Sequence, residues 1–269
     1  MSTITASVVL YKTNQSDVEK VIRSVKSNAD VKLFLIDNSP TDELKVFEDE
    51  SIIYIHNPSN PGFGAAHNIA IQKAMDSGAG YHFIVNPDVY FEGDVIMPMV
   101  NYMESNPNVG MMMPQILNDD GSIQNLPKLL PSPYSIFMRK FKRPSSVYNA
   151  FINKYELRFV ADDVLYNAPI LSGCFTLLRL SAIKEIGMYD DSYFMYFEDW
   201  DLSRRMHEKF KTMYYPEVSV YHGYESGANK SSRLFKIYIK SAITYFGKWG
   251  WFFDKYRGKI NKEALSQFK

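Results

Sequence analysis

The first 115 residues alternate between short apolar runs and segments of helical spacing, and this alternation limits the possible folds more than any other feature. Val, Ile and Leu dominate the apolar runs, as they do in strands that are covered on both faces of a parallel sheet. We therefore predict an α/β fold in which helices flank a mostly parallel central sheet. The expected strands are 3–11, 31–36, 52–55, 81–85 and 109–115.

Helix signals separate these runs. Ser16 and Glu19 have the spacing of a capping box, so the first helix is expected to begin there. The turn 60–64 is expected to open a second helix that runs to about Ser77, and 94–106 is a third.

From residue 117 to about 166 the alternation breaks down. Prolines indicate a loop, and the segment 136–152 mixes aromatic rings with Arg and Lys. Beyond it we expect strands over 170–180, 212–215 and 218–221, with a short helix over 181–186.

The composition narrows the class of protein. The chain has 269 residues, enough for one large domain or for a domain with an appendage. Its 30 basic and 30 acidic residues give a formal charge of zero, which argues against a nucleic-acid binder. A single cysteine, Cys174, excludes a disulfide framework and fits a reducing compartment. No apolar run approaches the ~18 residues that span a bilayer, and the N-terminus lacks the basic region of a signal peptide. We expect a cytoplasmic protein, bound at most to the inner face of a membrane.

Residues 187–205, GMYDDSYFMYFEDWDLSRR, carry five carboxylates, together with the rings of Tyr193, Phe194, Tyr196 and Phe197, in a loop and the helix expected to open at Glu198. Rings stack on a sugar or a base, and a carboxylate held among them has its basicity tuned, so a binding cleft explains this mixture. The alternative is that Glu198, Asp199 and Asp201 only occupy the first turn of a helix, where the macrodipole favours negative charge.

Two further acids follow predicted strands. Asp37 ends the second strand, and Asp88 comes directly after the fourth. In open α/β sheets, ligands bind outside the carboxyl ends of the strands, so these positions favour a ligand site. For Asp37 an Asx-turn before Pro40 is the structural alternative. The glycine-rich turn 60–64 is a weak phosphate signal, and a tight turn explains it at least as well.

Seven short motifs follow one another along the chain. They are VVLY at 8–11, Asp37-Asn38, NPGFGAAHN at 60–68, NPD at 86–88, SGC at 172–174, YFEDWDL at 196–202 and His222. Taken together and in order, they resemble those of family 2 glycosyltransferases of the GT-A fold, and within that family they are most similar to the rhamnosyltransferase-like branch that builds bacterial surface polysaccharides. The resemblance spans about 7–227, and its specificity comes from the ordered series rather than from any one motif.

The resemblance implies a nucleotide-sugar half at about 1–115 and an acceptor half at about 116–227. The residues expected to bind the nucleotide are Tyr11, Asp37, Asn38, Gly62, Gly64, Asn68, Asn86 and Asp88. The carboxylate of Asp37 is suited to accept the imide N–H of uracil or thymine, with the Tyr11 ring beside the base. Family members commonly show two aspartates where this chain has Asn86 and Asp88, so one anionic metal ligand is missing. Asp88 and His222 are the expected ligands of Mn²⁺ or Mg²⁺.

The resemblance also implies an inverting transfer with Asp199 as the general base. A carboxylate on the face opposite the leaving nucleotide takes the proton of the acceptor hydroxyl, while the metal neutralises the departing diphosphate. Glu198 and Asp201 are expected to orient the base or to contact the acceptor. Ser172, Gly173 and Tyr196 are expected to lie against the acceptor or the donor sugar. The expected reaction moves a hexose or deoxyhexose from a UDP- or dTDP-sugar to a growing, lipid-linked surface glycan.

Two other functions remain open at this point. A sugar-1-phosphate nucleotidyltransferase shares a nucleotide-binding α/β core, but it needs an N-terminal glycine-rich loop that 11–14 lacks. A non-catalytic nucleotide-sugar binding module has no use for the acidic cluster at 198–201.

Residues 228–269 form a basic aromatic tail that is expected to be helical and lies largely outside the resemblance. Its apolar positions at helical spacing are Leu234, Tyr238, Ser241, Tyr245, Trp249, Phe252 and Tyr256. Edged by Lys and Arg, this stripe suits contact with anionic lipid at the inner leaflet. It equally suits packing on the catalytic domain or on a second subunit of a homodimer. Gly247 and Gly250 are expected to end the helix near Trp249.

Overall fold

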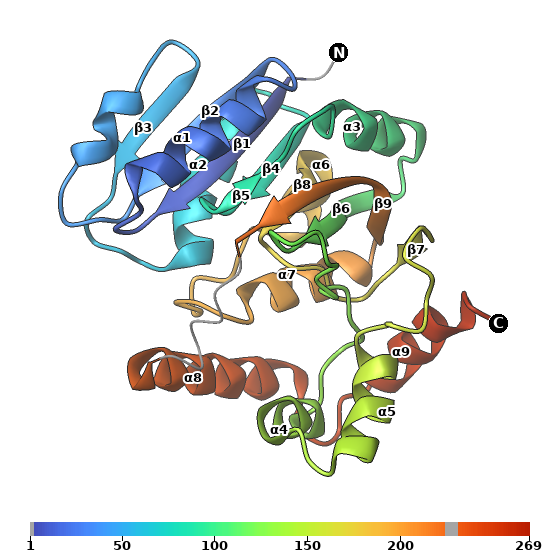
Figure 1. Ribbon diagram of the computed structural model, residues 1–269. Helices are drawn as coiled ribbons and strands as arrows, with labels where there is room; N and C mark the ends of the chain where they lie inside the picture. The colour runs from blue at the N-terminus through green and yellow to red at the C-terminus, as the bar shows by residue number, and fades with distance from the viewer. Residues whose placement is uncertain (1–2, 224–230) are drawn as a thin grey trace.

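The computed structural model describes residues 3–223 and 231–269, whose strands form one nine-stranded sheet (Figure 1). The strands are β1 Ile4–Leu10, β2 Val31–Asp37, β3 Ile52–His56, β4 Tyr81–Val85, β5 Val89–Tyr90, β6 Val109–Leu117, β7 Tyr166–Asn167, β8 Phe175–Arg179 and β9 Lys211–His222. Their order is β3-β2-β1-β4-β8-β6-β9-β5, with β7 paired to β9. β8 runs antiparallel to both of its neighbours, and β5 and β7 run antiparallel to β9. The other described strands run in one direction, so the predicted mostly parallel sheet is confirmed.

The helices cover the sheet and extend beyond it. They are α1 Gln15–Lys26, α2 Phe63–Asp76, α3 Ile96–Ser105, α4 Pro133–Phe141, α5 Ser145–Tyr155, α6 Leu180–Ile186, α7 Glu198–His207, α8 Ser232–Trp249 and α9 Arg257–Ser266, with a 3₁₀ helix η1 at Glu43–Phe47. The predicted elements of the first 115 residues are confirmed to within about two residues at each end, the usual disagreement between ways of assigning ends. The capping box is wrong: Asn14 is the N-cap of α1, and Ser16 lies inside the helix.

The second half of the chain departs from prediction in three places. The expected strand 170–180 shortens to β8, so 172–174 form a loop at its start. The two late strands are one strand, β9, whose register against β6 shifts between Pro114 and Gln115. The irregular region contains two helices, α4 and α5, that follow prolines and were not predicted. Proline is common at the start of a helix as well as in loops, and for this reason the prediction of a loop from these prolines was incomplete.

The tail helices α8 and α9 lie beside α4 and α5, below the sheet in the view of Figure 1. Tyr245 is fully buried, and the Tyr238 ring contacts those of Tyr196 and Phe197. The middle of the predicted stripe therefore packs on the catalytic domain, which was one of the alternatives, whereas Phe252 and Tyr256 remain exposed. The helix ends at Trp249, as predicted, where Gly250 takes a φ of +98°. Across 3–223 and 231–269, no helix combines the length and apolarity needed to cross a membrane.

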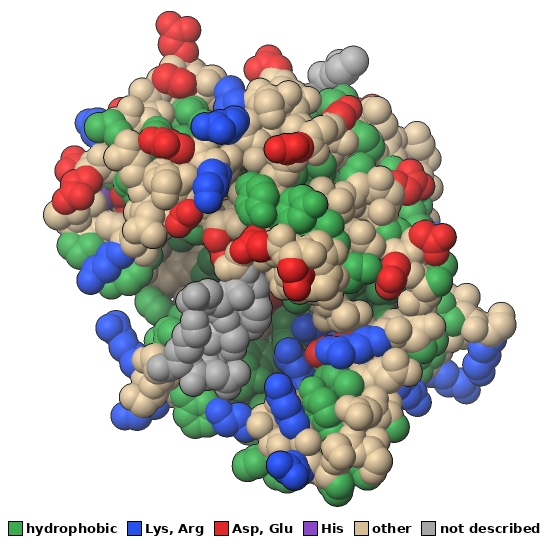
Figure 2. Space-filling model, in the orientation of Figure 1, with side chains coloured by type: hydrophobic (Ala, Val, Ile, Leu, Met, Phe, Trp, Pro, Cys, Tyr) green, Lys and Arg blue, Asp and Glu red, His purple; other side chains and the backbone are tan. Residues whose placement is uncertain are grey.

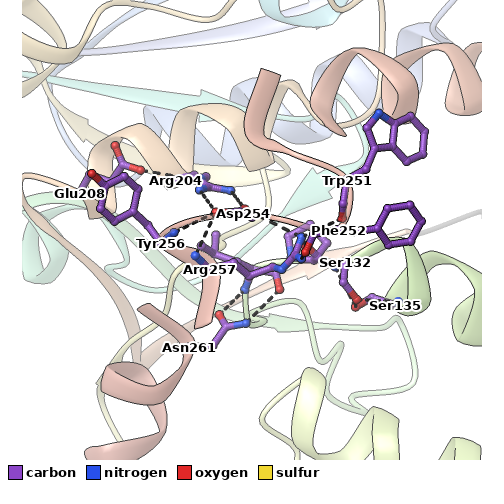
Figure 3. A network of polar contacts seen from close by, with 12 residues as sticks. Ser132, Ser135, Arg204, Glu208, Trp251, Phe252, Asp254, Tyr256, Arg257 and Asn261 are labelled. Atoms are coloured by element: carbon purple, nitrogen blue, oxygen red, sulfur yellow. Dashed lines mark hydrogen bonds and ion pairs between the residues drawn. The ribbon is translucent and has the colours of Figure 1, made fainter. Parts of the chain in front are cut away.

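A buried ion pair ties the tail to α7 (Figure 3). The Arg204 guanidinium donates to both carboxylate oxygens of Asp254, at 2.6 and 2.8 Å, and stacks 4.0 Å from the centre of the Trp249 ring. The Asp254 carboxylate also accepts from the backbone N–H groups of Tyr256 and Arg257, which opens α9. Both charged side chains are almost fully buried, so each one compensates for the loss of water around the other's charge.

We expect Asp254→Ala to destabilise the protein by about 3–5 kcal/mol, because it leaves the buried Arg204 guanidinium with only a 3.6 Å contact to the partly exposed Glu208. Chemical denaturation measures the change. Lys259→Ala is the matched control: its pair with Glu263 spans 3.8 Å between side chains that are 73% and 64% exposed. The control should stay within about 0.5 kcal/mol of wild type. Equal effects of the two substitutions would contradict the structural role of Asp254.

Candidate active site

The candidate site is built around the first turn of α7. Tyr196 and Phe197, directly before the helix, both take left-handed backbone conformations, with φ of 70° and 69°. Such conformations are unfavourable for residues other than glycine and persist only where the surroundings enforce them. Here they reverse the chain sharply, so that α7 starts at Glu198 with its acidic first turn against the 172–174 loop.

Asp199 lies against the backbone of Gly173. The Gly173 N–H donates to Asp199 Oδ2 at 3.2 Å, and the Trp200 N–H donates to Oδ1 at 2.9 Å. A Cβ on residue 173 would lie 3.3 Å from Asp199 Cβ, so glycine makes this close approach possible. Burial raises the pKa of the Asp199 carboxyl above its usual value, and the two N–H groups and Lys128 oppose that shift. A base with a raised pKa takes up a proton more readily near neutral pH.

Glu198 is the buried partner of this base. Its side chain is 5% exposed, and Oε2 has no hydrogen-bond partner in the described residues. Burial, and then the charge of Asp199, raise its pKa well above the usual value. Two adjacent carboxyls in a low-dielectric site cannot both ionise cheaply, so burial favours a single negative charge on the pair. The strongly raised pKa of Glu198 makes it the candidate proton donor beside Asp199.

Asp201 does not face this site, which corrects the expectation that it orients the base or contacts the acceptor. Its side chain is fully buried, and Oδ2 accepts from Arg205 at 2.8 Å. Oδ1 accepts from the Trp249 indole and from Lys248 of α8, both at 2.8 Å. Asp201 therefore anchors the tail to α7.

Asp88 and His222 meet at the carboxyl edge of the sheet, as the resemblance implied. Asp88 Oδ1 lies 3.4 Å from His222 Nε2, and the Asn86 amide lies 3.2 Å from the same nitrogen. Asp88 also lines a hollow of about 180 Å³ together with Lys20 and Asp119. The two residues that were expected to bind a metal, Asp88 and His222, therefore lie side by side.

Gln124 determines which ring nitrogen of His222 carries the proton. The Gln124 amide N–H donates to the His222 carbonyl at 2.8 Å, which turns the Gln124 Oε1 toward Nδ1 at 3.1 Å. An amide oxygen only accepts, so Nδ1 carries the hydrogen and the Nε2 lone pair faces Asn86 and Asp88. That is the arrangement in which a histidine binds a metal, with its second nitrogen held by a neighbouring acceptor. Among the described residues, no group of three or more His, Cys, Asp or Glu side chains is placed to hold an ion by itself.

The loop 172–174 joins the two ends of the site. The Asn86 N–H donates to the Cys174 carbonyl at 2.7 Å, and the Gly173 N–H holds Asp199 on the other side. The 172–174 loop thus contacts both Asp199 and the 86–88 motif that contains Asp88. The Cys174 thiol is buried, and burial raises its pKa to about 12, so it packs as an apolar side chain and is not a ready nucleophile.

The other residues expected to bind the nucleotide divide into a group at the ends of β1 and β2 and a group in and after the turn 60–64. Asp37 is fully buried: Oδ2 accepts from the Tyr54 hydroxyl at 2.7 Å, and Oδ1 accepts from the Ser39 N–H at 2.9 Å. The second bond is the Asx-turn that was the alternative reading. Asn38 is likewise engaged by the Asn57 amide at 2.9 Å. The ends of β2 and β4 lie two strand spacings, or about 10 Å, apart, with β1 between them. Tyr11, at the end of β1, is 47% exposed.

The turn 60–64 and Asn68 hold the loop before α7. Gly62 has a φ of +110°, and a Cβ there would lie 2.1 Å from the Phe194 carbonyl oxygen. A Cβ on Gly64 would similarly meet the Tyr189 side chain at 2.9 Å. The Asn68 side chain exchanges hydrogen bonds with the Tyr189 backbone at 2.9 and 3.0 Å. These residues serve close packing of two loops, and their contact with a nucleotide stays a prediction.

The remaining sugar-contact candidates are placed as follows. The Ser172 carbonyl accepts from the Thr176 hydroxyl at 2.6 Å, at the start of β8. The Tyr196 ring lies 5.6 Å from that of Tyr238 and so supports the tail. Sequence reasoning missed Gln124 and Lys128, both in the proline-rich stretch before α4, where no periodic pattern singles out a residue. It also did not assign Tyr189, whose buried hydroxyl has no partner in the described residues and lies near Gly173.

A profile of "Glycosyl transferase family 2" matches residues 7–187, which is most of the chain. The chain belongs to this family. Membership makes it a glycosyltransferase, and it favours sugar transfer over the nucleotidyltransferase and the binding module. The match ends before α7, so it does not itself assign a role to Asp199 or His222.

Curated relatives are rhamnosyltransferases and a hexosyltransferase. An N-acetylglucosaminyl-diphospho-decaprenol L-rhamnosyltransferase of Mycobacterium tuberculosis is 27% identical over 246 residues, covering 84% of this chain and 79% of the relative. The rhamnosyltransferase WbbL of Escherichia coli is 23% identical and covers 70% of each chain. A hexosyltransferase of low-salt glycan biosynthesis from Haloferax volcanii is 22% identical, covering 73% of this chain and 63% of the relative.

The fold has a solved counterpart. The structure of GalNAc-T7 with UDP, GalNAc and Mn²⁺ superimposes with a TM-score of 0.62 at 15% identity. It covers 90% of this chain, and this chain spans about half, 47%, of that one. The likeness confirms the predicted GT-A fold.

We expect Glu198→Gln to stabilise the protein increasingly as the pH rises above 4.5, the ordinary value for a Glu carboxyl. The folded state keeps the Glu198 proton at a pH where the unfolded state has lost it, so wild-type stability falls with rising pH and the glutamine variant escapes that loss. Thermal midpoints between about pH 4.5 and pH 8 measure the difference. The exposed Glu263→Gln is the control. A Glu198→Gln difference that does not change with pH would contradict a proton held on Glu198.

Proposed function

We propose that this chain is an inverting glycosyltransferase in which Asp199 is the general base. The observation that carries the proposal is the placement of Asp199, with its raised pKa, against the Gly173 N–H, in the same short loop whose Cys174 carbonyl accepts from Asn86, two residues before Asp88. Inversion needs a base on the face of the sugar opposite the leaving diphosphate, so we propose that the donor sugar binds between Asp199 and the Asp88 edge. Asp199 takes the proton of the acceptor hydroxyl as that oxygen attacks the sugar carbon. The bond from that carbon to the diphosphate breaks in the same step.

Glu198 assists by staying neutral. A second negative charge at that position would oppose the approach of an anionic donor and raise the cost of burying Asp199. Its protonated carboxyl is instead a donor for a sugar hydroxyl, as is the buried Tyr189 hydroxyl, which lies near Gly173 as Asp199 does.

A divalent cation fits the edge formed by Asp88 and His222. A carboxylate oxygen beside an imidazole nitrogen with its lone pair directed inward is a donor set for Mn²⁺, less so for Mg²⁺. With Asn86 in place of an acid, the protein supplies two ligands, which leaves room for oxygens of a diphosphate. When bound, the cation would stabilise the charge that develops on the leaving diphosphate.

The donor and acceptor classes come from the relatives. Two of them are named as rhamnosyltransferases, and one of these as acting on a decaprenol-diphosphate sugar. We infer that this chain moves a rhamnose-like deoxyhexose or a hexose from a UDP- or dTDP-sugar to a lipid-linked diphosphate glycan. Tyr11 remains the proposed contact for the base, because its exposed ring lies at the end of β1.

We expect Asp199→Asn to lower kcat by about 10²–10⁴-fold, the usual contribution of a general base, with little change in donor binding. Product formation from a panel of UDP- and dTDP-sugars with a lipid-diphosphate acceptor measures the rate, and NMR of the product reports the anomeric configuration. Asp163→Asn, at an exposed position, is the control. Retention of configuration, or undiminished transfer by Asp199→Asn, would refute the role of Asp199.

We also propose that the enzyme works at the cytoplasmic face of a membrane. Figure 2 shows Lys and Arg side chains gathered around hydrophobic ones over the lower part of the molecule, where Figure 1 places α4 and α8. We call the exposed apolar residues of these elements and of the following loop the aromatic-basic face; they are Phe137, Phe141, Phe235, Ile239, Ile243, Trp251, Phe252 and Phe253. Lys140 Nζ lies 4.5 Å from the centre of the Phe235 ring, which joins α4 to α8.

An anionic lipid surface suits the aromatic-basic face better than water does. Phe252 is 77% exposed and Phe253 is 97% exposed. Exposed rings beside Lys and Arg insert at the headgroup level while the cations meet lipid phosphates. Removal of the whole tail cannot test this, because Tyr245 and Phe246 belong to the core.

Replacing Phe252 and Phe253 together by Ser should weaken binding to anionic vesicles by about tenfold or more, since each ring contributes apolar area. Co-sedimentation with phosphatidylglycerol and with neutral vesicles measures it. Val46→Ser, on η1 and 73% exposed, is the control. If the wild-type protein ignores anionic vesicles and light scattering shows a dimer that the double variant abolishes, the face binds a second copy instead.

A further inference from the structure

A buried ammonium group lies beside Asp199, and none of the roles derived so far uses it. Lys128 is 5% exposed, and its Nζ lies 5.3 Å from the centre of the Trp200 ring. In the parts of the chain that the structure describes, Nζ makes no hydrogen bond or ion pair, yet it is not fully closed off from solvent, so a ligand can reach it. Burial, and then the charge of Arg139, lower the pKa of Lys128 to about 8, so it still carries a proton at neutral pH. An ammonium that is mostly removed from water and has no direct partner is unfavourable, and a bound anion would relieve it.

Arg139 brings a second positive charge to the same ring. Its guanidinium carbon lies 6.0 Å from the centre of Trp200, and Nε lies 3.4 Å from Glu156. Glu156 is also paired with Arg158, so this buried acid is shared between two guanidinium groups. The charges of Glu156 and Asp199 both act on Lys128, and the three cations Lys128, Arg139 and Arg158 outnumber these two acids.

The position of Lys128 relates this charge to the base. Its backbone N–H and C=O both pair with Ile170, at 3.1 Å, at the start of the segment that leads to Gly173 and its bond to Asp199. Trp200 itself follows Asp199 directly. Arg139 lies on α4, whose next residue, Lys140, contacts Phe235 of the aromatic-basic face. The two cations thus lie on the acceptor side of the base, toward the proposed lipid surface, whereas the proposed metal ligands are on β9 and beside β5.

We propose that Lys128 and Arg139, both stacked on Trp200, form a binding subsite for a phosphate group of the acceptor. This rests on the proposed function, because only a base at Asp199 defines an acceptor side. A diphosphate attached to the sugar that receives the new residue would accept charge-assisted hydrogen bonds from both cations. It would then hold that sugar with a hydroxyl at Asp199. The subsite would select acceptors that carry phosphate over the same sugar on a neutral carrier.

Lys128→Met tests the subsite with two acceptors, one bearing a diphosphate and one bearing the same sugar on a neutral aglycone. We expect KM for the diphosphate acceptor to rise about tenfold to hundredfold, since a hydrogen bond to a charged group is lost, with no change for the neutral acceptor. Lys128→Arg should restore most of the loss. Lys154→Met, at an exposed position on α5, is the matched control. Equal losses with both acceptors, or no loss with either, would overturn the subsite.

A binding measurement without turnover separates this inference from the proposed function. Calorimetric titration with inorganic diphosphate and with UDP or dTDP compares wild type with Lys128→Met. Weaker diphosphate binding with unchanged nucleotide binding supports the subsite even if no transfer is detected. A loss of nucleotide affinity would instead assign Lys128 to the donor and overturn the acceptor assignment. Met fills the volume of the Lys stem without its charge, so the variant should fold with an unchanged or higher thermal midpoint.

Discussion

The first turn of α7 is held from two opposite sides, and the geometry of the site depends on this double attachment. On one side Gly173 donates its N–H to Asp199. On the other, Asp201 accepts from Trp249 and Lys248 of the tail helix α8. The left-handed residues Tyr196 and Phe197 would relax if either attachment were lost, because their backbone conformation is unfavourable alone. The tail is therefore part of the support of the site and not an appendage to it.

The same turn also brings two carboxyl groups, those of Glu198 and Asp199, next to each other. Glu198 and Asp199 are adjacent and shielded from water, so a single negative charge is the state of lowest free energy for the pair. The α7 N-terminus and the two backbone N–H groups favour placing that charge on Asp199. Lys128 supports it from the acceptor side. The order of the side chains along the helix thus separates a charged base from a neutral donor one residue apart.

Much of the fold was predictable because strands and helices in the first 115 residues follow their own periodicity. Strand ends placed Asp88 correctly, and the ordered motifs singled out Asp199 and the 172–174 loop separately, whereas their contact is known only from the structure. The role of Asp201 was not predictable, since three carboxylates in one helical turn look alike in sequence while their directions differ by about 100° per residue. The two glycines of the 60–64 turn were equally ambiguous: close packing and phosphate contact both require glycine, and only Phe194 and Tyr189 reveal the packing.

Lys128 and Gln124 show a different limit of sequence reasoning. Both lie between β6 and α4, where hydrogen bonds of loops rather than periodic patterns decide direction. Gln124 bonds both the ring and the carbonyl of His222, 98 positions away, and by this means selects the histidine tautomer. This contact depends on the pairing of β9 with β6. The register of the two strands shifts between Pro114 and Gln115 of β6, and this shift sets the position of the end of β9, where His222 lies. A one-residue slip would turn the imidazole to the opposite face of the sheet and separate it from Asp88. The register of one irregular strand pair therefore decides whether the donor end of the site exists at all.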